Sequence, residues 1–194
     1  MNTAGIILAA GESRRMGRPK AFLPFRGGTF LSTLADTFAP FCSPVIAVFG
    51  FDWEAAATLA PPGVRAVINR EYRRGMLTSL QAGLRALAHK FPDRVLFTLV
   101  DHPAISSGTV ARLMATDAVI AIPRTEGKRG HPVLVRAGIA REFLHEPADA
   151  KVRDVIDRHA ADILYVDVED PGIRDDVDDP ALYEALLARE AARL

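Results

Sequence analysis

The sequence contains very little cysteine, carries no net charge and has no long hydrophobic run. Cys42 is the only cysteine among 194 residues, which excludes a disulfide framework; it fits a reducing cytosol but does not decide the compartment. Its apolar neighbours predict a small buried side chain. The 24 Lys and Arg residues equal the 24 Asp and Glu residues in number. No overall field would therefore draw the chain to nucleic acid or to a membrane surface.

No apolar run approaches the roughly 20 residues that a membrane-spanning helix needs. The apolar start at Ile6–Ala10 is short and lacks the basic flank of a signal peptide. Internal repeats, low-complexity tracts and recognisable linkers are also missing. We therefore expect a cytoplasmic protein that binds neither nucleic acid nor membranes, with a single domain over residues 1–194.

Apolar runs of strand length recur along the chain. They are nearly continuous in Val, Ile and Leu, which is typical of strands covered on both faces of a parallel sheet. The runs are Ala4–Ala10, Ser43–Gly50, Val64–Asn69, Arg94–Asp101 and Ala118–Pro123, and shorter strands are predicted at Val133–Val135 and Ile163–Val168.

Helical patterns separate these strands, and the clearest is Met76–Phe91, where apolar residues recur at steps of three and four. The alternation predicts an α/β fold with an open, mostly parallel, doubly wound sheet and helices on both faces. Ligands of such sheets bind beyond the carboxyl ends of the strands. Further helices are predicted after the capping residues Thr29, Asp52 and Ser106 or Ser107, near residues 138–145 and 151–159, and from Pro180.

The stretch Leu8–Lys20, directly after the first predicted strand, is rich in glycine and basic residues. Gly11 and Gly17 would let backbone amides approach an anion, and Arg15 and Lys20 would supply charge. The composition predicts a phosphate-binding loop, although a basic surface turn has the same composition.

Two common phosphate loops do not fit this stretch. A Walker loop needs Lys directly after its second glycine, but Arg18 and Pro19 stand there. The dinucleotide fingerprint needs a second glycine two residues after the first, and Ser13 occupies that position. Both common nucleotide-binding folds are therefore disfavoured.

The stretch matches the nucleotidyltransferase signature L-A-[AG]-G-x-[SG]-x-R-[ML]-G-x-x-K. The chain therefore resembles the small nucleotidyltransferases, which have a Rossmann-like fold and activate phosphorylated acceptors, and among them the molybdenum cofactor cytidylyltransferases. The matching residues are Leu8, Ala9, Ala10, Gly11, Ser13, Arg15, Met16, Gly17 and Lys20.

The resemblance implies roles in binding a nucleoside triphosphate. Backbone from Gly11 to Gly17, with Arg15 and Lys20, would hold the phosphates, and the backbone near Leu8, Ala9 and Ala10 would meet the base. The segment GMLTSLQAGL resembles a family helix whose serine, Ser79 here, faces the base. Without the resemblance, Ser79 could equally be an ordinary residue of the helix surface.

LVDHP, Leu99–Pro103, resembles the family's L-x-D-x-P, in which the aspartate holds magnesium. A single carboxylate that faces a triphosphate suffices for Mg²⁺. Asp101 is therefore expected to bind Mg²⁺, since Ser106 and Ser107 are available to cap the next helix. His102 is expected to be a partly exposed loop residue without a chemical role.

GKRGHPVLV, Gly127–Val135, resembles the G-x-R-G-H-P-V-L motif of the cytidylyltransferases, which borders the acceptor pocket. The resemblance assigns acceptor binding to Arg129, Gly130, His131 and Pro132. A plain turn before a strand could also use Gly130 and Pro132.

DVDDP, Asp176–Pro180, resembles the family's D-x-D-x-P. Asp179 before Pro180 is a good start for a helix, which would explain the motif without any chemistry. Alternatively, Asp176 or Asp178 reaches the metal or the acceptor, and we take Asp178 as the second candidate ligand.

The resemblance implies Mg²⁺-dependent transfer of a nucleotidyl group to molybdopterin or the molybdenum cofactor, with release of pyrophosphate. Arg15, Lys20 and Asp101 are the candidate catalytic residues. Ala10 favours CTP by resemblance, and a molybdenum-dependent apoenzyme is a candidate partner. The alternatives are a sugar-phosphate or polyol-phosphate nucleotidyltransferase and a non-catalytic chaperone that binds the cofactor for a molybdenum enzyme.

Overall fold

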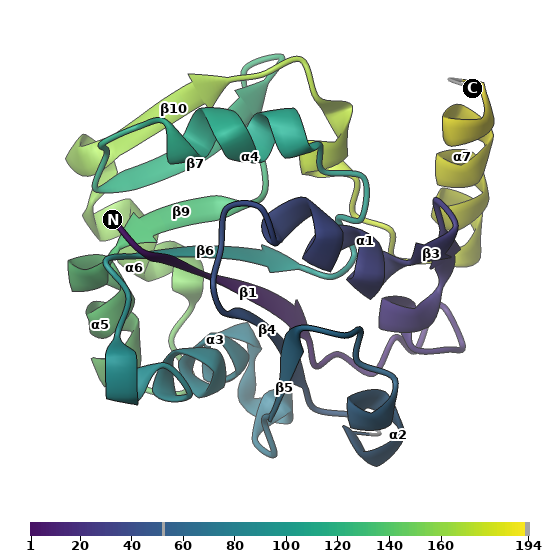
Figure 1. Ribbon diagram of the computed structural model, residues 1–194, viewed down its shortest axis with the longest axis horizontal. Helices are drawn as coiled ribbons and strands as arrows, with labels where there is room; N and C mark the ends of the chain where they lie inside the picture. Colours follow the sequence, from purple (N-terminus) through teal and green to yellow (C-terminus); the bar gives the residue numbers. More distant parts are fainter. Residues whose placement is uncertain (52, 193–194) are drawn as a thin grey trace.

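The computed structural model describes residues 1–51 and 53–192, so the predicted cap at Asp52 lies outside the described residues. An eight-stranded sheet crosses the molecule in the order β10-β7-β9-β6-β1-β4-β5, with β8 paired to β7 (Figure 1). Its strands are β1 (Thr3–Ala9), β4 (Val45–Phe49), β5 (Val64–Ile68), β6 (Arg94–Leu99), β7 (Ile120–Thr125), β8 (Lys128–Arg129), β9 (Val133–Arg136) and β10 (Ile163–Asp167).

The sheet is mostly parallel. β5, β4, β1 and β6 pair in parallel, as do β7 and β10, whereas β9 runs antiparallel to both β6 and β7. A small hairpin, β2 (Pro24–Phe25) and β3 (Gly28–Thr29), lies outside this sheet. The predicted α/β class with an open, mostly parallel sheet is confirmed.

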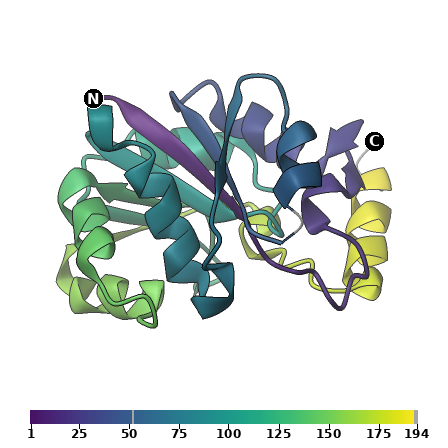
Figure 2. The same cartoon turned by 90° about the horizontal axis from the view of Figure 1, so that it is seen from below.

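Helices cover both faces of the sheet (Figures 1 and 2). One face carries α1 and α4, and the other carries α3, α5 and α6. The helices are α1 (Phe30–Phe38), α2 (Trp53–Thr58), α3 (Met76–Arg85), α4 (Ser107–Met114), α5 (Ala137–His145), α6 (Val152–Arg158) and α7 (Pro180–Ala191).

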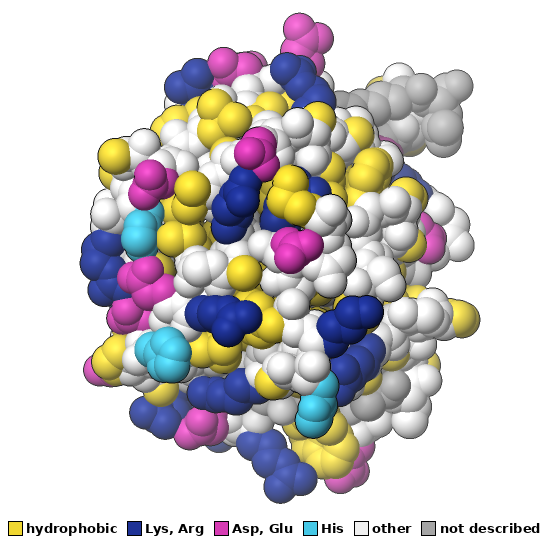
Figure 3. Space-filling view, turned by 60° about the vertical axis from the view of Figure 1, so that its left-hand side comes forward, with side chains coloured by type: hydrophobic (Ala, Val, Ile, Leu, Met, Phe, Trp, Pro, Cys, Tyr) yellow, Lys and Arg dark blue, Asp and Glu magenta, His cyan; other side chains and the backbone are white. Residues whose placement is uncertain are grey.

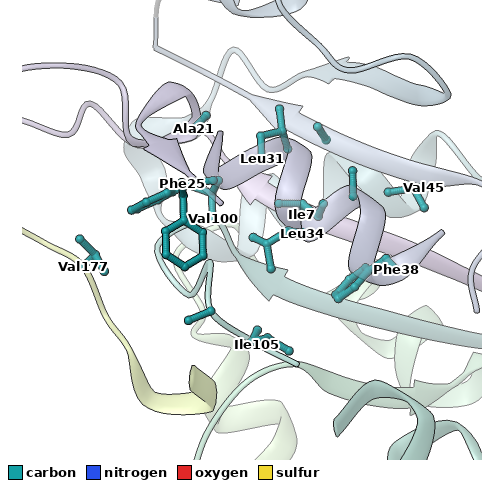
Figure 4. Close-up of a cluster of buried hydrophobic side chains, with 14 of the residues drawn as sticks. Ile7, Ala21, Phe25, Leu31, Leu34, Phe38, Val45, Val100, Ile105 and Val177 are labelled. Carbon is teal, nitrogen blue, oxygen red and sulfur yellow. The ribbon is translucent and has the colours of Figure 1, made fainter. Parts of the chain in front are cut away.

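Local sequence explains how α1 begins and which face it buries. The Thr29 hydroxyl accepts from the Ser32 amide and the Ser32 hydroxyl accepts from the Thr29 amide, which forms a capping box. Leu31, Leu34 and Phe38 then point toward the sheet, where they share a buried cluster with Ile7 of β1 (Figure 4). Val100 and Val177 join the same core, from two segments that matter for the site below.

Two expectations about the elements were wrong. The helix predicted over Met76–Phe91 ends at Arg85, and a short 3₁₀ turn covers Ala88–Lys90. Phe91 is extended with ψ 129°, as expected for a residue before proline. The strand predicted over Val64–Asn69 is not covered on both faces, because β5 forms an edge of the sheet and Arg65 and Ala66 are exposed.

The single cysteine has the buried environment that its apolar neighbours predict. Cys42 is buried with 5% exposure, and burial raises the pKa of its thiol to about 12. Over the described residues, none of the helices has the length and apolar character to span a membrane. Basic and acidic side chains are interspersed on the face shown in Figure 3.

Candidate active site

The carboxyl ends of β1 and β6 bring two of the predicted segments together. These strands are parallel neighbours with Leu8 opposite Leu99, and the Val100 amide donates to the Leu8 carbonyl at 3.0 Å. The loop after β1 and Asp101 after β6 therefore emerge side by side. They border a cavity of about 400 Å³.

The loop after β1 is folded around Ser13. Its carbonyl accepts from the Met16 and Gly17 amides at 3.0 and 3.1 Å, and its hydroxyl accepts from the Lys20 amide at 3.2 Å. Ser13 and Gly17 have positive φ angles of 49° and 71°. Gly17 therefore serves a left-handed turn, and it does not line the cavity.

Glu12 fastens this loop to a segment 60 residues later. Its carboxylate accepts from the Tyr72 hydroxyl at 3.0 Å and from Arg73 Nε at 2.9 Å, and also pairs with Arg14. Hydrogen bonds from Arg73, Arg14 and Tyr72 lower the pKa of Glu12 to about 2. The signature leaves the position of Glu12 free, so sequence reasoning missed this tie.

The segment before α7 delivers carboxylates to the end of β6. The Val177 amide donates to the Asp101 carbonyl at 3.0 Å, and the Val177 side chain is buried with 2% exposure. Because side chains alternate along an extended segment, Asp176 and Asp178 on either side point away from that core. Asp179 accepts from the Leu182 amide and caps α7, so the motif starts a helix and also supplies carboxylates.

Asp101, Asp176 and Asp178 form a cluster whose candidate ligand atoms all lie within 4.8 Å of one another. Burial raises the pKa of Asp176, and the charges of Asp101 and Asp178 raise it further. A cation among these carboxylates would relieve that repulsion. Oxygen donors of this kind suit Mg²⁺ or Mn²⁺, so the residues present fit a divalent metal.

Two basic side chains of the loop reach the same cluster (Figure 2 shows the two chain segments side by side). Lys20 Nζ lies 3.2 Å from Asp101 Oδ2 and also pairs with Asp178, while Arg15 pairs with Asp178. Lys20 is buried, and the Arg15 side chain is 67% exposed. The hydrogen bond from Lys20 is the main cause of the lowered pKa of Asp178.

His102 differs from the expectation of a partly exposed loop residue. It is 7% exposed, and its Nδ1 lies 2.9 Å from Asp101 Oδ1. Burial raises the pKa of Asp101, but the hydrogen bond and charge of His102 and the charge of Lys20 outweigh this effect and lower it overall. The His102 ring also contacts His131, with centroids 4.6 Å apart. His102 was expected to have no chemical role because the motif leaves its position free.

The predicted base-binding residues line the same cavity as Asp101 and Asp178. Ser79 on α3 is buried and faces the cavity, so it is not an ordinary residue of the helix surface. The wall includes all of the predicted nucleotide-binding residues apart from Gly17: Leu8, Ala9, Ala10, Gly11, Ser13, Arg15, Lys20 and Ser79.

A second cavity of about 330 Å³ lies next to the first, and Met76 lines both. Arg129, Gly130 and His131 line this second cavity, whereas Pro132 does not. Its remaining wall is mostly apolar, with His102 and two further arginines: Phe97, His102, Ile122, Val133, Val152, Ile156, Ile173, Arg153 and Arg174.

His131 is held as a neutral ring in that wall. Burial, followed by the charge of His102, lowers its pKa to about 3. Its Nδ1 is buried and has no hydrogen-bond partner among the described residues. A buried polar atom without a partner is costly, and this nitrogen has almost no exposed surface, so the ring would have to turn before a ligand in the second cavity could pair with it.

Comparison with known proteins identifies the family. A family model described as a MobA-like NTP transferase domain matches residues 5–163. The chain belongs to this family. Membership of the MobA-like nucleotidyltransferases confirms the resemblance that the signature indicated, and it makes the chain a member of an enzyme family that transfers nucleotides.

Two relatives align over most of the chain. It is 34% identical over 190 residues to a nicotine blue oxidoreductase of Paenarthrobacter nicotinovorans, with 90% of this chain and 91% of the relative covered. It is 29% identical over 181 residues to the molybdenum cofactor cytidylyltransferase of Escherichia coli strain K12, with 90% of each covered.

Solved structures share the fold of this chain. A homologue of Rv0371c from Mycobacterium sp. strain JC1 superposes with a TM-score of 0.82 at 25% identity, covering 99% of this chain and 98% of that one. Rv0371c of Mycobacterium tuberculosis H37Rv, in a structure described as a complex with manganese, gives 0.77 at 25% identity, covering 97% and 99%.

Proposed function

We propose that this chain transfers CMP from CTP to a phosphorylated acceptor, most simply molybdopterin in the molybdenum cofactor, and releases pyrophosphate. One observation carries the proposal. Lys20 from the loop after β1, Asp101 from the end of β6, and Asp178 from the segment before α7 meet in one cavity. Cationic groups for phosphates and carboxylates for a divalent metal are thereby placed together.

In the proposed reaction an oxygen of the acceptor phosphate forms a bond to the α-phosphorus of CTP. The bond from that phosphorus to the bridging oxygen breaks, and pyrophosphate leaves with the electron pair. The attacking oxygen is already anionic, so orientation and charge neutralisation suffice and no strong general base is needed. Lys20 and Arg15 would neutralise phosphate charge as the bond to pyrophosphate breaks.

Asp101, Asp176 and Asp178 would hold Mg²⁺, which supplies positive charge beside the phosphate oxygens when bound. Asp178 pairs with both Lys20 and Arg15. We infer that these basic side chains turn toward the triphosphate when the carboxylates bind metal. The manganese complex of the Mycobacterium tuberculosis neighbour supports a divalent ion in this fold.

The choice of CTP rests on two supports. Ala10 lies on the cavity wall and matches the cytidylyltransferase form of the signature. The cytidylyltransferase relative aligns with 90% of this chain, whereas a probable molybdenum cofactor guanylyltransferase of Mycobacterium avium strain 104 aligns with 63% at 35% identity.

The choice of acceptor rests on the second cavity. Its apolar wall suits a flat heterocycle, and its arginines suit phosphate. We propose that a molybdenum-dependent apoenzyme in the cytoplasm receives the product, again from the resemblance to the cytidylyltransferases.

The test is pyrophosphate release with CTP, UTP and GTP against molybdopterin and a panel of sugar and polyol phosphates, each with and without Mg²⁺. Turnover with CTP and molybdopterin is expected. Turnover of a sugar phosphate in place of molybdopterin would refute the proposed acceptor. Absence of CTP binding in calorimetry would favour the non-catalytic chaperone.

The relative named nicotine blue oxidoreductase favours a second candidate function, an oxidoreductase whose substrate occupies the apolar second cavity. The measurement is loss of NADH or NADPH absorbance with nicotine blue as acceptor, made on the same preparation as the pyrophosphate assay. Reduction of the dye without pyrophosphate release would support this second function over nucleotidyl transfer.

A further inference from the structure

Asn69 lies behind the base-binding wall, at the end of β5. It is 5% exposed, and its backbone N–H donates to the Phe49 carbonyl of the neighbouring strand at 2.7 Å. Its side-chain oxygen accepts from the Glu71 amide at 2.9 Å. A backbone N–H can only donate, so this bond fixes which end of the Asn69 side chain is oxygen. The NH₂ group must then face α3.

That NH₂ group donates to two hydroxyls of α3. Nδ2 lies 2.8 Å from Thr78 Oγ1 and 3.0 Å from Ser79 Oγ, so each of its two hydrogens has an acceptor. Thr78 passes its own hydrogen to the Gly75 carbonyl at 2.8 Å, with the Glu71 carbonyl at 3.2 Å. Every polar hydrogen of Asn69 and Thr78 is therefore used within the protein.

Ser79 is different. Its oxygen accepts from Asn69, but across residues 1–51 and 53–192 its hydroxyl hydrogen meets no protein acceptor. The side chain is 4% exposed and lines the first cavity beside Ala9 and Ala10. A nearly buried hydroxyl is stabilised by a hydrogen-bond partner. The direction left for that partner is the cavity.

We propose that Asn69 is a positioning residue that commits Ser79 to donate its hydrogen to the base of the bound nucleotide. This inference rests on the proposed function and deepens it. The hydroxyl hydrogen then pairs with an acceptor on the base, such as the ring nitrogen or carbonyl oxygen of cytosine. Ser79 touches the base, and Asn69 acts through Ser79.

The test uses Asn69→Asp, which keeps the size of the side chain and its bond from the Glu71 amide. A carboxylate has no hydrogen to give, so it accepts the hydrogen of Ser79 and turns the serine lone pairs toward the base. Calorimetry with CTP and Mg²⁺ is expected to show binding weakened by about tenfold or more. Inorganic tripolyphosphate, which has no base, should bind this variant and the original chain equally.

Two further variants separate positioning from structural damage. Ser79→Ala alone should weaken CTP binding, and adding Asn69→Asp to it should cause little further loss, because both changes remove the same bond. Thr78→Val removes the other Asn69 contact away from the cavity, and CTP binding should stay within about twofold. Thermal unfolding of each variant reports on the fold.

The inference is overturned if Asn69→Asp leaves CTP binding unchanged, or weakens it equally with and without Ser79. It is also overturned if tripolyphosphate binding falls in parallel with CTP binding, because the damage would then not concern the base. Failure of the original chain to bind any nucleoside triphosphate would instead refute the proposed function itself.

Discussion

Lys20 lies where two kinds of charge meet. It is buried, and it contacts Asp101 at 3.2 Å and also Asp178. A buried cation is stable only with partners, and here the partners are the carboxylates of the candidate metal site. Phosphates and a divalent metal would supply the same charges in exchange, so binding of the two is expected to be coupled at this residue.

Replacing Lys20 or Asp101 by Ala should lower turnover with CTP, Mg²⁺ and the true acceptor by on the order of a hundredfold or more, because each change removes a group that compensates phosphate charge. Initial rates of pyrophosphate release measure this. Arg18→Ala is the control, since Arg18 lies over the Tyr183 ring and outside the cavity wall. Near-normal rates in the Lys20 or Asp101 variant would refute the site.

The neighbouring aspartates before α7 should separate by role. Asp176→Asn should weaken Mn²⁺ binding by about tenfold, because a ligand of the acidic cluster is lost. Asp179→Asn retains a side chain that can cap α7 and should bind Mn²⁺ as the original chain does. Calorimetry with Mn²⁺ alone measures the affinity of both variants. Equal losses of affinity would argue against Asp176 as a metal ligand.

His131 should make stability depend on pH. Its pKa is about 3 in the folded chain against an ordinary value of 6.5, so between these values the unfolded chain takes up a proton that the folded chain refuses. The free energy of unfolding therefore falls as the pH falls, by up to about 1.4 kcal/mol per pH unit from this group. Urea unfolding at several pH values should show a smaller fall in His131→Gln. Parallel curves for the two proteins would contradict a neutral His131.

At the scale of elements, the loop that contains Gly130 and His131, before β9, packs closely against the turn that contains Ile173. The His131 amide donates to the Ile173 carbonyl at 2.8 Å, and a Cβ at Gly130 would lie 2.2 Å from that oxygen. Two walls of the second cavity meet at this point. Glycine is needed at position 130 because any side chain would collide with this oxygen, not because the backbone has a positive φ angle.

Gly130→Ala should therefore destabilise the chain by about 1–3 kcal/mol and weaken acceptor binding, because backbone atoms must move. Gly138→Ala, in the first turn of α5, meets no atom within 4 Å and should be neutral or stabilising by up to about 1 kcal/mol. Urea midpoints of the two variants measure the difference. A stable Gly130→Ala protein would show that the loop is free to shift.

Element types were predictable where a local signal was strong. Thr29 and either Ser106 or Ser107 were expected to cap helices, and the hydroxyls of Thr29 and Ser106 accept backbone amide hydrogen bonds at those helix starts. The end of α3 was not predictable, because Leu87 continues the apolar spacing and is buried although it lies beyond the helix. Apolar spacing reports burial, and a 3₁₀ turn can bury the same residues as another turn of α-helix.

At the scale of the molecule, the sheet was predictable as a class but not in its order. Nothing local in Val133–Val135 indicates that β9 inserts between β6 and β7 and runs antiparallel to both. That insertion places His131 beside His102. Long-range pairing depends on which edges remain free after the other strands assemble, and a single sequence does not reveal this.

The candidate site, too, was predictable from the sequence only in part. Lys20, Asp101 and Asp178 lie in motifs of fixed spacing, so their meeting could be expected. Glu12 and Asn69 contact the site through hydrogen bonds with Tyr72 and Ser79, which form only when the chain folds. Residues that touch ligands leave short sequence signals, whereas residues that position them leave a contact between distant elements.

The most direct measurement follows the α-phosphate. The chain is incubated with CTP labelled at the α-phosphorus, Mg²⁺ and molybdopterin, and the products are separated. Transfer of CMP predicts label in the pterin product, one pyrophosphate released per labelled product, and loss of both in Asp101→Ala. Label that stays in CTP while the chain binds CTP and molybdopterin, or label that appears only as free CMP, would contradict nucleotidyl transfer to this acceptor.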